Sequence, residues 1–470
     1  MPDPSHIYQS HIFHPTILRA YDIRGIVGET LHVEDARAIG HAFGLLFEAG
    51  ARIAIGRDGR LSSPDLATAL SEGLVDAGCH VLDIGVGPTP MLYFADVALS
   101  CAGAIQVTGS HNPPTHNGFK MVRAHRPFYG ADIQQLGTDA LTLKGRAGGR
   151  YETQDIIDLY TEKLADQADF GNLSAVWDTG NGAAGPALIS MLEKIDKSAS
   201  EKPAQHCLFT EIDGTFPNHH PNPVDPETLD ILRDKVNEMG ADLGIGFDGD
   251  GDRIGVIDQR GRQVAGDLLT ALLARDVLER HPGAPILFDV KSSELALELV
   301  RQAGGKPMLW KTGHSHMKEK MREIGAPIAG EMSGHIFIKD RYYGFDDALY
   351  VAMRLVSLLN QKQLSMADFL DSLPDLHASP EIGIACPDEE KFALIDRLSA
   401  KLKANLPDGY ALTDIDGVRL GNADGWWLLR PSNTEAKLVT RAEGKTADLL
   451  EKHLKMVQNA LKEEGLDWSY

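Results

Sequence analysis

The chain has 470 residues, 43% of them hydrophobic and 24% charged, and its formal net charge at pH 7 is −21. A chain of this length is too long for one hydrophobic core and predicts three or four domains. The negative charge argues against nucleic acid or an anionic membrane as a partner, because phosphate-rich surfaces attract basic protein faces. A local basic pocket for a small phosphorylated ligand stays compatible with this composition.

The sequence shows no targeting or membrane-spanning pattern. The opening stretch "MPDPSHIYQSHIFHPT" lacks a basic region followed by an apolar core, and no run of about eighteen apolar residues occurs, so a cytoplasmic location is expected. The cysteines show no CxxC pair or zinc-ligand spacing, which favours free buried thiols over disulfides. They are Cys79, Cys101, Cys207 and Cys386.

One strand–turn–helix pattern occurs three times along the chain, at residues 51–78, 173–195 and 284–305. Each copy has a short apolar strand, a turn rich in Asp, Gly or Ser, and apolar residues at helical spacing. The strands end at Asp58, Asp178 and Asp289, a spacing that corresponds to one domain. The pattern therefore predicts three copies of one domain.

Each copy continues with a second and then a third apolar segment, and such alternation predicts α/β domains with mixed, largely parallel sheets. The expected α/β domains are residues 1–157, 158–262 and 263–374. Residues 375–470 contain several strand-like segments and a closing helix from Thr446, which predicts a smaller α+β domain. The unusual polar loops follow the third strand of each copy, where ligands of α/β sheets gather, and so predict one composite cleft.

The first of these loops to carry clear chemistry is "DGDGDR", residues 248–253. Three aspartates at alternate positions can converge on one cation, and hard carboxylate oxygens favour Mg²⁺ or Ca²⁺ over zinc. An EF-hand is excluded, because Arg253 and Gln259 stand where such a loop needs glycine and glutamate. The alternative is a solvated acidic turn, in which the three charges would repel each other.

Ser110 lies in the corresponding loop of the first copy, "VTGSHNPPTHNGFK". No GxSxG elbow surrounds it, and a bare hydroxyl without a base is a poor nucleophile. Beside three metal-binding aspartates it suggests a phosphoserine, whose phosphate would complete the coordination of the metal. His111, Arg24 and Lys120 could neutralise that phosphate. The alternative is an ordinary turn residue before "NPP".

Two further loops have the composition of a sugar phosphate site. In "GEMSGH", Glu331 and Ser333 suit vicinal sugar hydroxyls and His335 could shuttle protons, although a plain turn is an equal alternative. In "RPSNTEAK", Arg430 can bind a phosphate bidentately, or else the segment serves as a helix cap.

A dinucleotide-binding enzyme is a separate alternative, because "GNGAAG", residues 180–185, fits the G-x-G-x-x-G fingerprint between a strand and a helix. Against this alternative, the fingerprint lies in the second copy and Asp178 adjoins its turn. Close packing of the helix on the strand explains the glycines equally well.

Taken together, "AYDIRG", "VTGSHNPPTHNGFK", "DGDGDR", "GEMSGH" and "RPSNTEAK" in this order resemble the α-D-phosphohexomutase family over nearly the whole chain. Within the family, "AYDIRG" and "GEMSGH" are most similar to the bacterial phosphomannomutase/phosphoglucomutase group. The resemblance implies four domains around a deep cleft, one Mg²⁺, and transfer of phosphate between C1 and C6 of glucose or mannose phosphates. It also implies a phosphorylated serine and a glucose or mannose 1,6-bisphosphate intermediate.

The resemblance assigns roles to individual residues. Asp248, Asp250 and Asp252, with phosphorylated Ser110, would hold Mg²⁺, and Arg253, Arg24 and His111 would lie near the phosphoserine. Lys120 and His335 would be the acid and base. The residues facing the substrate would be Tyr21, Lys291, His314, Glu331 and Ser333, and the distal phosphate would bind Arg430, Ser432, Asn433 and Thr434. The phosphate loop departs from the family pattern near Ala436, where relatives often have proline.

Two rival functions share parts of this pattern. A phosphoglucosamine mutase would use the same mechanism, but its members usually open with "GTDGIRG" rather than "AYDIRG". A non-catalytic sugar phosphate binder would not need three metal-binding aspartates. Small hexose phosphates are therefore the expected partners, and a monomer or a dimer is the expected assembly.

Overall fold

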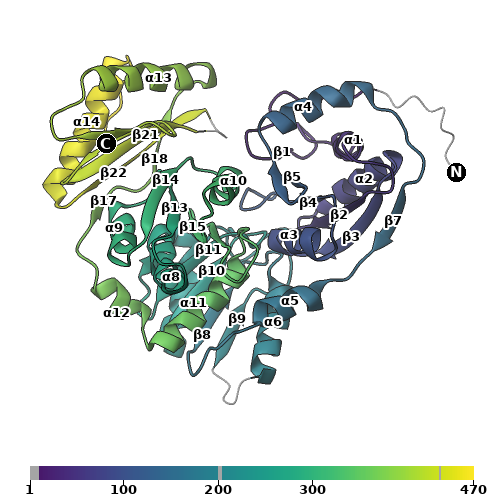
Figure 1. Cartoon of the computed structure of the whole chain (residues 1–470), viewed down its shortest axis with the longest axis horizontal. Helices are drawn as coiled ribbons and strands as arrows, with labels where there is room; N and C mark the ends of the chain where they lie inside the picture. Colours follow the sequence, from purple (N-terminus) through teal and green to yellow (C-terminus); the bar gives the residue numbers. More distant parts are fainter. Residues whose placement is uncertain (1–9, 199–203, 433–435) are drawn as a thin grey trace.

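The computed structural model describes residues 10–198, 204–432 and 436–470, and these form four domains that follow one another around an arc (Figure 1). Each domain contains one β-sheet. Among the described residues, no helix is both long and apolar enough to cross a membrane. All four cysteines are free; Cys207 is half-buried, and the other three are buried as expected.

The first domain has a seven-stranded sheet in the order β1-β5-β4-β2-β3-β7, with β6 paired to β5. Its elements are β1 (Ile23–Ile26), α1 (Val33–Gly44), β2 (Arg52–Arg57), α2 (Ser63–Asp76), β3 (His80–Val86), α3 (Thr89–Ala98), β4 (Gly103–Val107), β5 (His116–Arg123), β6 (Arg126–Phe128), α4 (Ala131–Asp139), the 3-10 helix Ala140–Thr142 and β7 (Arg150–Thr153).

The second domain has a five-stranded sheet in the order β12-β11-β10-β8-β9. Its elements are α5 (Ile157–Ala165), β8 (Ala175–Asp178), α6 (Gly185–Ser198), β9 (Gln205–Leu208), the 3-10 helix Pro226–Leu229, α7 (Asp230–Met239), β10 (Leu243–Phe247), β11 (Ile254–Asp258) and β12 (Gln263–Val264).

The third domain has a four-stranded sheet in the order β14-β13-β15-β16. Its elements are α8 (Gly266–Arg280), β13 (Pro285–Asp289), α9 (Glu294–Gln302), β14 (Lys306–Trp310), α10 (His314–Ile324), β15 (Ile328–Gly330), β16 (Ile336–Ile338), α11 (Ala348–Lys362) and α12 (Met366–Asp371).

The three α/β domains share one topology. In each, the first strand of the repeat (β2, β8 or β13) pairs in parallel with the second and third strands. The third strand then pairs antiparallel with the strand that follows it. The sheets are therefore mixed, and the three chemically distinctive loops are the equivalent connections β4–β5, β10–β11 and β15–β16. The predicted repeat and its loop positions are confirmed.

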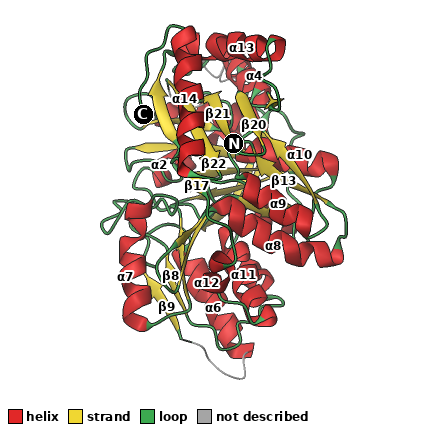
Figure 2. Cartoon of the chain, turned by 90° about the vertical axis from the view of Figure 1, so that its left-hand side faces the viewer, coloured by secondary structure: helices red, strands yellow, loops and turns green. Residues whose placement is uncertain are grey.

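The fourth domain is an α+β unit with an antiparallel sheet in the order β17-β22-β21-β20-β19, and β18 also pairs with β22. Helices α13 and α14 pack on this sheet (Figure 2). Helix α14 begins after Thr446, whose side chain accepts a hydrogen bond from the amide of Leu449. The elements are β17 (His377–Ala378), β18 (Ile382–Ala385), α13 (Asp388–Ala404), β19 (Ala411–Thr413), β20 (Val418–Asn422), β21 (Gly425–Pro431), β22 (Lys437–Gly444) and α14 (Ala447–Glu463).

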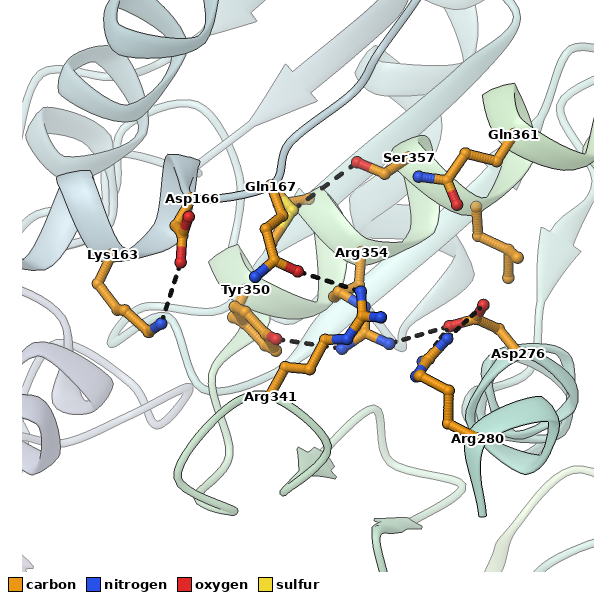
Figure 3. A pocket seen from close by; sticks show the side chains of 12 residues that line it. Lys163, Asp166, Gln167, Asp276, Arg280, Arg341, Tyr350, Arg354, Ser357 and Gln361 are labelled. Atoms are coloured by element: carbon orange, nitrogen blue, oxygen red, sulfur yellow. Dashed lines mark hydrogen bonds and ion pairs between the residues drawn. The ribbon is translucent and has the colours of Figure 1, made fainter. Parts of the chain in front are cut away.

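The second and third domains share one hydrophobic core, which also takes in α3 of the first domain. At the surface of this seam, Arg280 and Arg354 both bind Asp276, at 2.7 and 3.0 Å, and Arg341 donates to Gln167 at 3.1 Å (Figure 3). The cavity between these side chains is only about 40 Å³, too small for a sugar phosphate. The seam is thus a structural joint, while the domain boundaries at 157/158, 262/263 and 374/375 stay predictions.

The Ser110 loop is held from below by Arg60, a fully buried side chain at the start of the β2–α2 turn. Its guanidinium donates to the carbonyls of Ser110, Asn112 and Pro113 at 2.7 Å each, and to that of His116 at 3.0 Å. Five donors in a rigid fork suit this geometry, which no lysine could reproduce.

Asp58, which directly follows β2, completes this support. Its Oδ2 accepts hydrogen bonds from the Thr108 hydroxyl at 2.8 Å and the Gly109 amide at 3.1 Å, and it pairs with Arg60 Nε at 3.2 Å. The backbone before and after Ser110 is therefore fixed by two buried, mutually paired side chains. Such support allows Ser110 to keep a left-handed backbone conformation with φ 50°.

Arg60→Met should lower the free energy of unfolding by about 3–5 kcal/mol, because buried carbonyls lose their donor and Asp58 is left as an unpaired buried charge. Arg301→Met is the matched control. Arg301 is 46% exposed and pairs with exposed glutamates, so its loss should cost under about 1 kcal/mol. Denaturant unfolding measures both changes. Amide hydrogen exchange at residues 108–112 should rise in the Arg60 variant alone, and equal protection in both variants would contradict this account.

Candidate active site

A cleft of about 690 Å³ opens between the domains, and all four of them contribute to its lining. Eleven of the predicted site residues line it directly: Tyr21, Arg24, His111, Arg253, Lys291, His314, Glu331, Ser333, His335, Arg430 and Ser432. Asn433 and Thr434 lie outside the described residues. The structure therefore brings together side chains that are up to four hundred residues apart in the sequence.

The remaining predicted residues lie beneath the cleft and are buried. Ser110 is 2% exposed and Lys120 is 4% exposed, while the three aspartates of the β10–β11 loop have no exposed surface. The Ser110 hydroxyl donates to Asp248 Oδ2 at 3.0 Å and lies 3.1 Å from His111 Nδ1. The serine loop of the first domain and the aspartate loop of the second domain are thus in direct contact.

Lys120 neutralises much of the aspartate loop. Its ammonium donates to Asp250 Oδ2 at 2.7 Å and also contacts Asp252 Oδ2. Burial disfavours the charged ammonium, but the two carboxylates outweigh it and raise the pKa of Lys120 well above its usual value. Lys120 is therefore a protonated group and a proton donor in this arrangement.

The pKa values of the three aspartates are shifted in different directions. Burial opposes ionisation of Asp250, but the charge of Lys120 and the hydrogen bonds from Lys120 and Thr89 lower its pKa overall. Burial and the neighbouring carboxylates instead raise the pKa of Asp248 well above its usual value. Three carboxylates with so little compensating positive charge are the arrangement that a divalent cation stabilises.

The residues of this loop fit a magnesium ion. Asp248, Asp250 and Asp252 each offer a carboxylate oxygen, and these atoms lie within 4.8 Å of one another. Within the described residues, the buried Oδ1 atoms of Asp250 and Asp252 accept no hydrogen bond. An all-oxygen set of three carboxylates that leaves positions for other ligands is typical of Mg²⁺ sites.

His335 lies at the cleft side of the same loop. Arg253 Nε donates to His335 Nε2 at 2.9 Å, so that nitrogen carries no proton. On the other side of the ring, Nδ1 lies 3.1 Å from Asp346 Oδ2. Asp346 is fully buried and also binds Lys318 Nζ at 2.8 Å. Arg253 therefore orients the imidazole by a hydrogen bond, and Asp346 adds an electrostatic contact that lacks hydrogen-bond geometry.

The pKa values of His111 and His314 are both held low, which favours the neutral imidazoles. Burial, with the charges of Arg253 and Arg24, holds the pKa of His111 well below its usual value. Burial, with the charge of Lys318, does the same for the pKa of His314. Neutral imidazoles can accept or donate a hydrogen bond to a sugar hydroxyl or phosphate.

The β15–β16 loop holds Glu331 with its carboxylate toward the cleft. Glu331 Oε1 accepts from the Gly313 amide at 2.8 Å, and Oε2 accepts from the Ser333 hydroxyl at 3.0 Å. Burial raises the pKa of Glu331. Asp289, which ends β13, accepts from the Met332 amide at 3.3 Å and supports this loop as Asp58 supports the serine loop.

The fourth domain supplies a cationic end to the cleft. Arg430 Nε donates to Asp416 Oδ2 at 2.9 Å, and Lys291 Nζ pairs with Glu381 Oε2 at 2.9 Å across the boundary between the third and fourth domains. Burial disfavours the charge of Lys291, but Glu381 and Asp289 raise its pKa. Both cations are thus fixed in position while remaining charged.

Several residues that shape this site had no predicted role: Arg60, Thr89, Lys318, Asp346, Glu381 and Asp416. The repeat pattern singled out Asp58 and Asp289 only as strand ends. The supporting role of these two aspartates could have been inferred from their shared position at the end of the first strand of each copy. That position lies beneath the loop that follows the third strand.

The "GNGAAG" segment is a packing feature. A Cβ atom at Gly185 would lie 2.0 Å from the Thr210 carbonyl oxygen, and one at Gly182 would lie 2.9 Å from the carbonyl oxygen of Gly249 in the aspartate loop. Asp178 accepts from the Gly180 amide at 2.8 Å and binds His219 at 3.0 Å. The glycines let a helix and the aspartate loop approach closely, which removes the need for a dinucleotide.

Four family models match consecutive parts of the chain. They are described as phosphoglucomutase/phosphomannomutase alpha/beta/alpha domain I at residues 15–138, domain II at 158–261, domain III at 265–377, and the C-terminal domain at 381–460. Their order along the chain is that of the four sheets of the structure.

Known proteins resemble the chain over almost its whole length. A phosphomannomutase/phosphoglucomutase of Pseudomonas putida is 46% identical over 438 residues, 91% of each protein. A phosphoglucomutase of Neisseria gonorrhoeae is 40% identical and covers 95% of this chain and 96% of its own. A crystal structure from Burkholderia thailandensis, of a phosphoglucomutase/phosphomannomutase family protein, has a TM-score of 0.88 at 41% identity and covers 97% of this chain and 98% of its own. The chain belongs to the phosphoglucomutase/phosphomannomutase group of the α-D-phosphohexomutase family.

Proposed function

We propose that the chain is a phosphomannomutase/phosphoglucomutase, an isomerase that moves a phosphoryl group reversibly between C1 and C6 of glucose and mannose phosphates. The observation that carries the proposal is the contact between Ser110 and Asp248 at the base of a four-domain cleft. A hydroxyl that lies on a cation-binding loop, beneath a pocket of arginines and sugar-binding groups, is suited to carry a phosphate. The names of the relatives supply the substrate class.

In the proposed reaction, the phosphate on Ser110 passes to the free hydroxyl of a bound hexose phosphate. The P–O bond to serine breaks and a P–O bond to the sugar forms, which yields the 1,6-bisphosphate. After the bisphosphate turns end over end, its other phosphate returns to Ser110. Each transfer moves one proton from the attacking hydroxyl to a base and returns one to the leaving oxygen.

The acid and base have different positions in this proposal. Lys120 is buried beside the metal loop, and a cation bound by Asp250 and Asp252 would free its ammonium to donate a proton to the leaving oxygen of Ser110. His335 lines the cleft, and its unprotonated Nε2 could take a proton from the sugar hydroxyl once Arg253 turns from it to the phosphate. Arg24 and Arg253 are placed to bind the transferring phosphate.

Asp248, Asp250, Asp252 and the phosphate of Ser110 would hold Mg²⁺. When bound, the ion supplies positive charge for the oxygens of the transferring phosphoryl group. At the other end of the cleft, Arg430, Ser432 and Lys291 would bind the phosphate that is not reacting. Because the bisphosphate binds in two orientations, this end must accept both of its phosphates, which suits general anion donors. A monomer in the cytoplasm remains the expected form, with a dimer as the alternative.

Ser110→Ala should reduce mutase turnover by about 10⁴-fold or more, because no other group can carry the phosphate. The matched control is Ser100→Ala, since Ser100 is exposed but shares the left-handed φ of 50°. Steady-state assays measure both, and intact-protein mass should show a phosphate on the wild type and on the control only. Sustained turnover by fully dephosphorylated enzyme without added bisphosphate would sink the phosphoserine mechanism.

Asp250→Asn should weaken Mg²⁺ binding by at least about tenfold, because one anionic ligand of a small set becomes neutral. Titration calorimetry measures the affinity directly, without turnover. Asp234→Asn, an exposed aspartate on α7, should leave the affinity unchanged. Zn²⁺ should support activity poorly at this all-oxygen site. Full activity in excess chelator would contradict the assignment.

Glucose 1-phosphate and mannose 1-phosphate should be converted with kcat/KM values within roughly tenfold, or about 1.4 kcal/mol. These sugars differ only at C2, whereas Glu331 and Ser333 are proposed to bind the hydroxyls at C3 and C4. Galactose 1-phosphate should be far worse, because its C4 hydroxyl leaves a buried carboxylate without its partner. Assays of the three sugars decide the matter, and equal rates for galactose and glucose phosphates would show that the loop does not bind C4.

A further inference from the structure

A second cavity lies between the first and third domains, where β6 contacts α10. Its volume is about 350 Å³, within the range of small-molecule sites. It shares no lining residue with the active-site cleft. The substrate is therefore bound elsewhere, and this cavity has no role in the reaction as proposed.

The cavity carries positive charge on a chain whose net charge is strongly negative. Four of its lining residues are cationic side chains, Lys318, Arg126, Arg322 and Lys339, against the two carboxylates Asp96 and Glu319. Arg126 pairs with Glu319, and Lys318 pairs with Asp346. Arg322 and Lys339 are exposed and form no ion pair or hydrogen bond through their side chains within the described part of the chain.

The remaining wall of the cavity is largely apolar and includes the rings of Tyr93, Tyr343 and Phe345. Tyr343 is 41% exposed, and its ring stacks on that of Phe345 at 5.7 Å with an interplanar angle of 5°. Tyr93 lies behind Phe345, with ring centroids 5.6 Å apart. An exposed aromatic face beside two unpaired cations suits a ligand that has both a planar ring and an anionic group.

We propose that this cavity binds a nucleoside phosphate, with the base against Tyr343 and the phosphate between Arg322 and Lys339. Inorganic phosphate would leave the aromatic wall unused, and a hexose phosphate has no planar ring to stack on it. Stacking on a tyrosine ring and pairing with two cations do not distinguish one base from another, so purine and pyrimidine nucleotides should bind with similar affinity.

The cavity is also connected to the active site. Lys318 lines the cavity and binds Asp346 Oδ1 at 2.8 Å, while Asp346 Oδ2 lies 3.1 Å from Nδ1 of His335. Asp346 directly follows Phe345 of the aromatic wall. A bound phosphate that attracts Lys318, or a base that moves Phe345, therefore acts on the carboxylate that contacts the histidine. We infer that nucleotide binding changes the turnover of the enzyme, a step that rests on the proposed function.

Titration calorimetry of the full chain with AMP and UMP tests the site, with adenosine and inorganic phosphate as partial ligands. Both nucleotides should bind, each more tightly than either partial ligand. Saturating glucose 1-phosphate should not displace them, because the cleft is separate. Failure of the nucleotides to bind, or their displacement by glucose 1-phosphate, would overturn the proposal.

Charge reversal locates the site. Arg322→Glu and Lys339→Glu should each weaken nucleotide binding by about tenfold or more, since a charged hydrogen bond is lost and repulsion added. Arg275→Glu, on the exposed face of α8, is the matched control and should bind as the wild type does. Equal affinities in all three variants would overturn the assignment to this cavity.

Turnover measurements test the connection separately. AMP should change kcat for glucose 1-phosphate without acting as a competitor, and this effect should be lost in Arg322→Glu, whose activity without nucleotide stays normal. Competitive inhibition, or binding with no change in kcat, would overturn the regulatory inference. The binding titrations need no turnover, so they stand even if the chain fails to act as a mutase.

Discussion

The structure depends on the burial of three carboxylates in one loop. Asp248, Asp250 and Asp252 have no contact with water, and like charges in such surroundings repel strongly. Lys120 and Thr89 reach them from the first domain, and the amides of Asp252 and Arg253 bind Asp248. The same contacts that stabilise the charges also hold the first two domains together and place Ser110 above the loop. The contacts that shape the cleft are therefore the same contacts that stabilise the charges of the metal site.

Much of the fold was open to prediction because local patterns determine it. The three strand–turn–helix copies, their loops and the closing helix after Thr446 are all present. The mixed character of the sheets was predicted and is confirmed, but apolar runs alone did not identify β5, β11 and β16 as the antiparallel strands. The pairing of a strand depends on contacts across the sheet. A short apolar segment has the same sequence pattern whether it pairs in parallel or antiparallel.

The chemistry of the site was readable where several reactive residues are neighbours in the sequence, as in the aspartate loop. Single residues that act through distant partners were not readable. Arg60 resembles any surface arginine until the loop it supports is placed over it, and Asp346 gains meaning only from His335 and Lys318. The strand-end aspartates were predicted only in part. The repeat revealed their positions, but it did not reveal that Asp58 and Asp289 support the loops.

The aspartates of the loop are far in the sequence from their partners in the first domain, and this separation affects how the site forms during synthesis. Lys120 contacts Asp250 from 130 residues away, and Thr89 does so from 161 residues away. A chain that leaves the ribosome from its N-terminus presents the first domain well before those carboxylates exist. The face that carries Lys120 must then stay hydrated, because an ammonium without a partner cannot be buried cheaply. The serine loop thus acquires its final surroundings only after translation has passed the second domain, and a ribosome stalled earlier holds a chain without a working site.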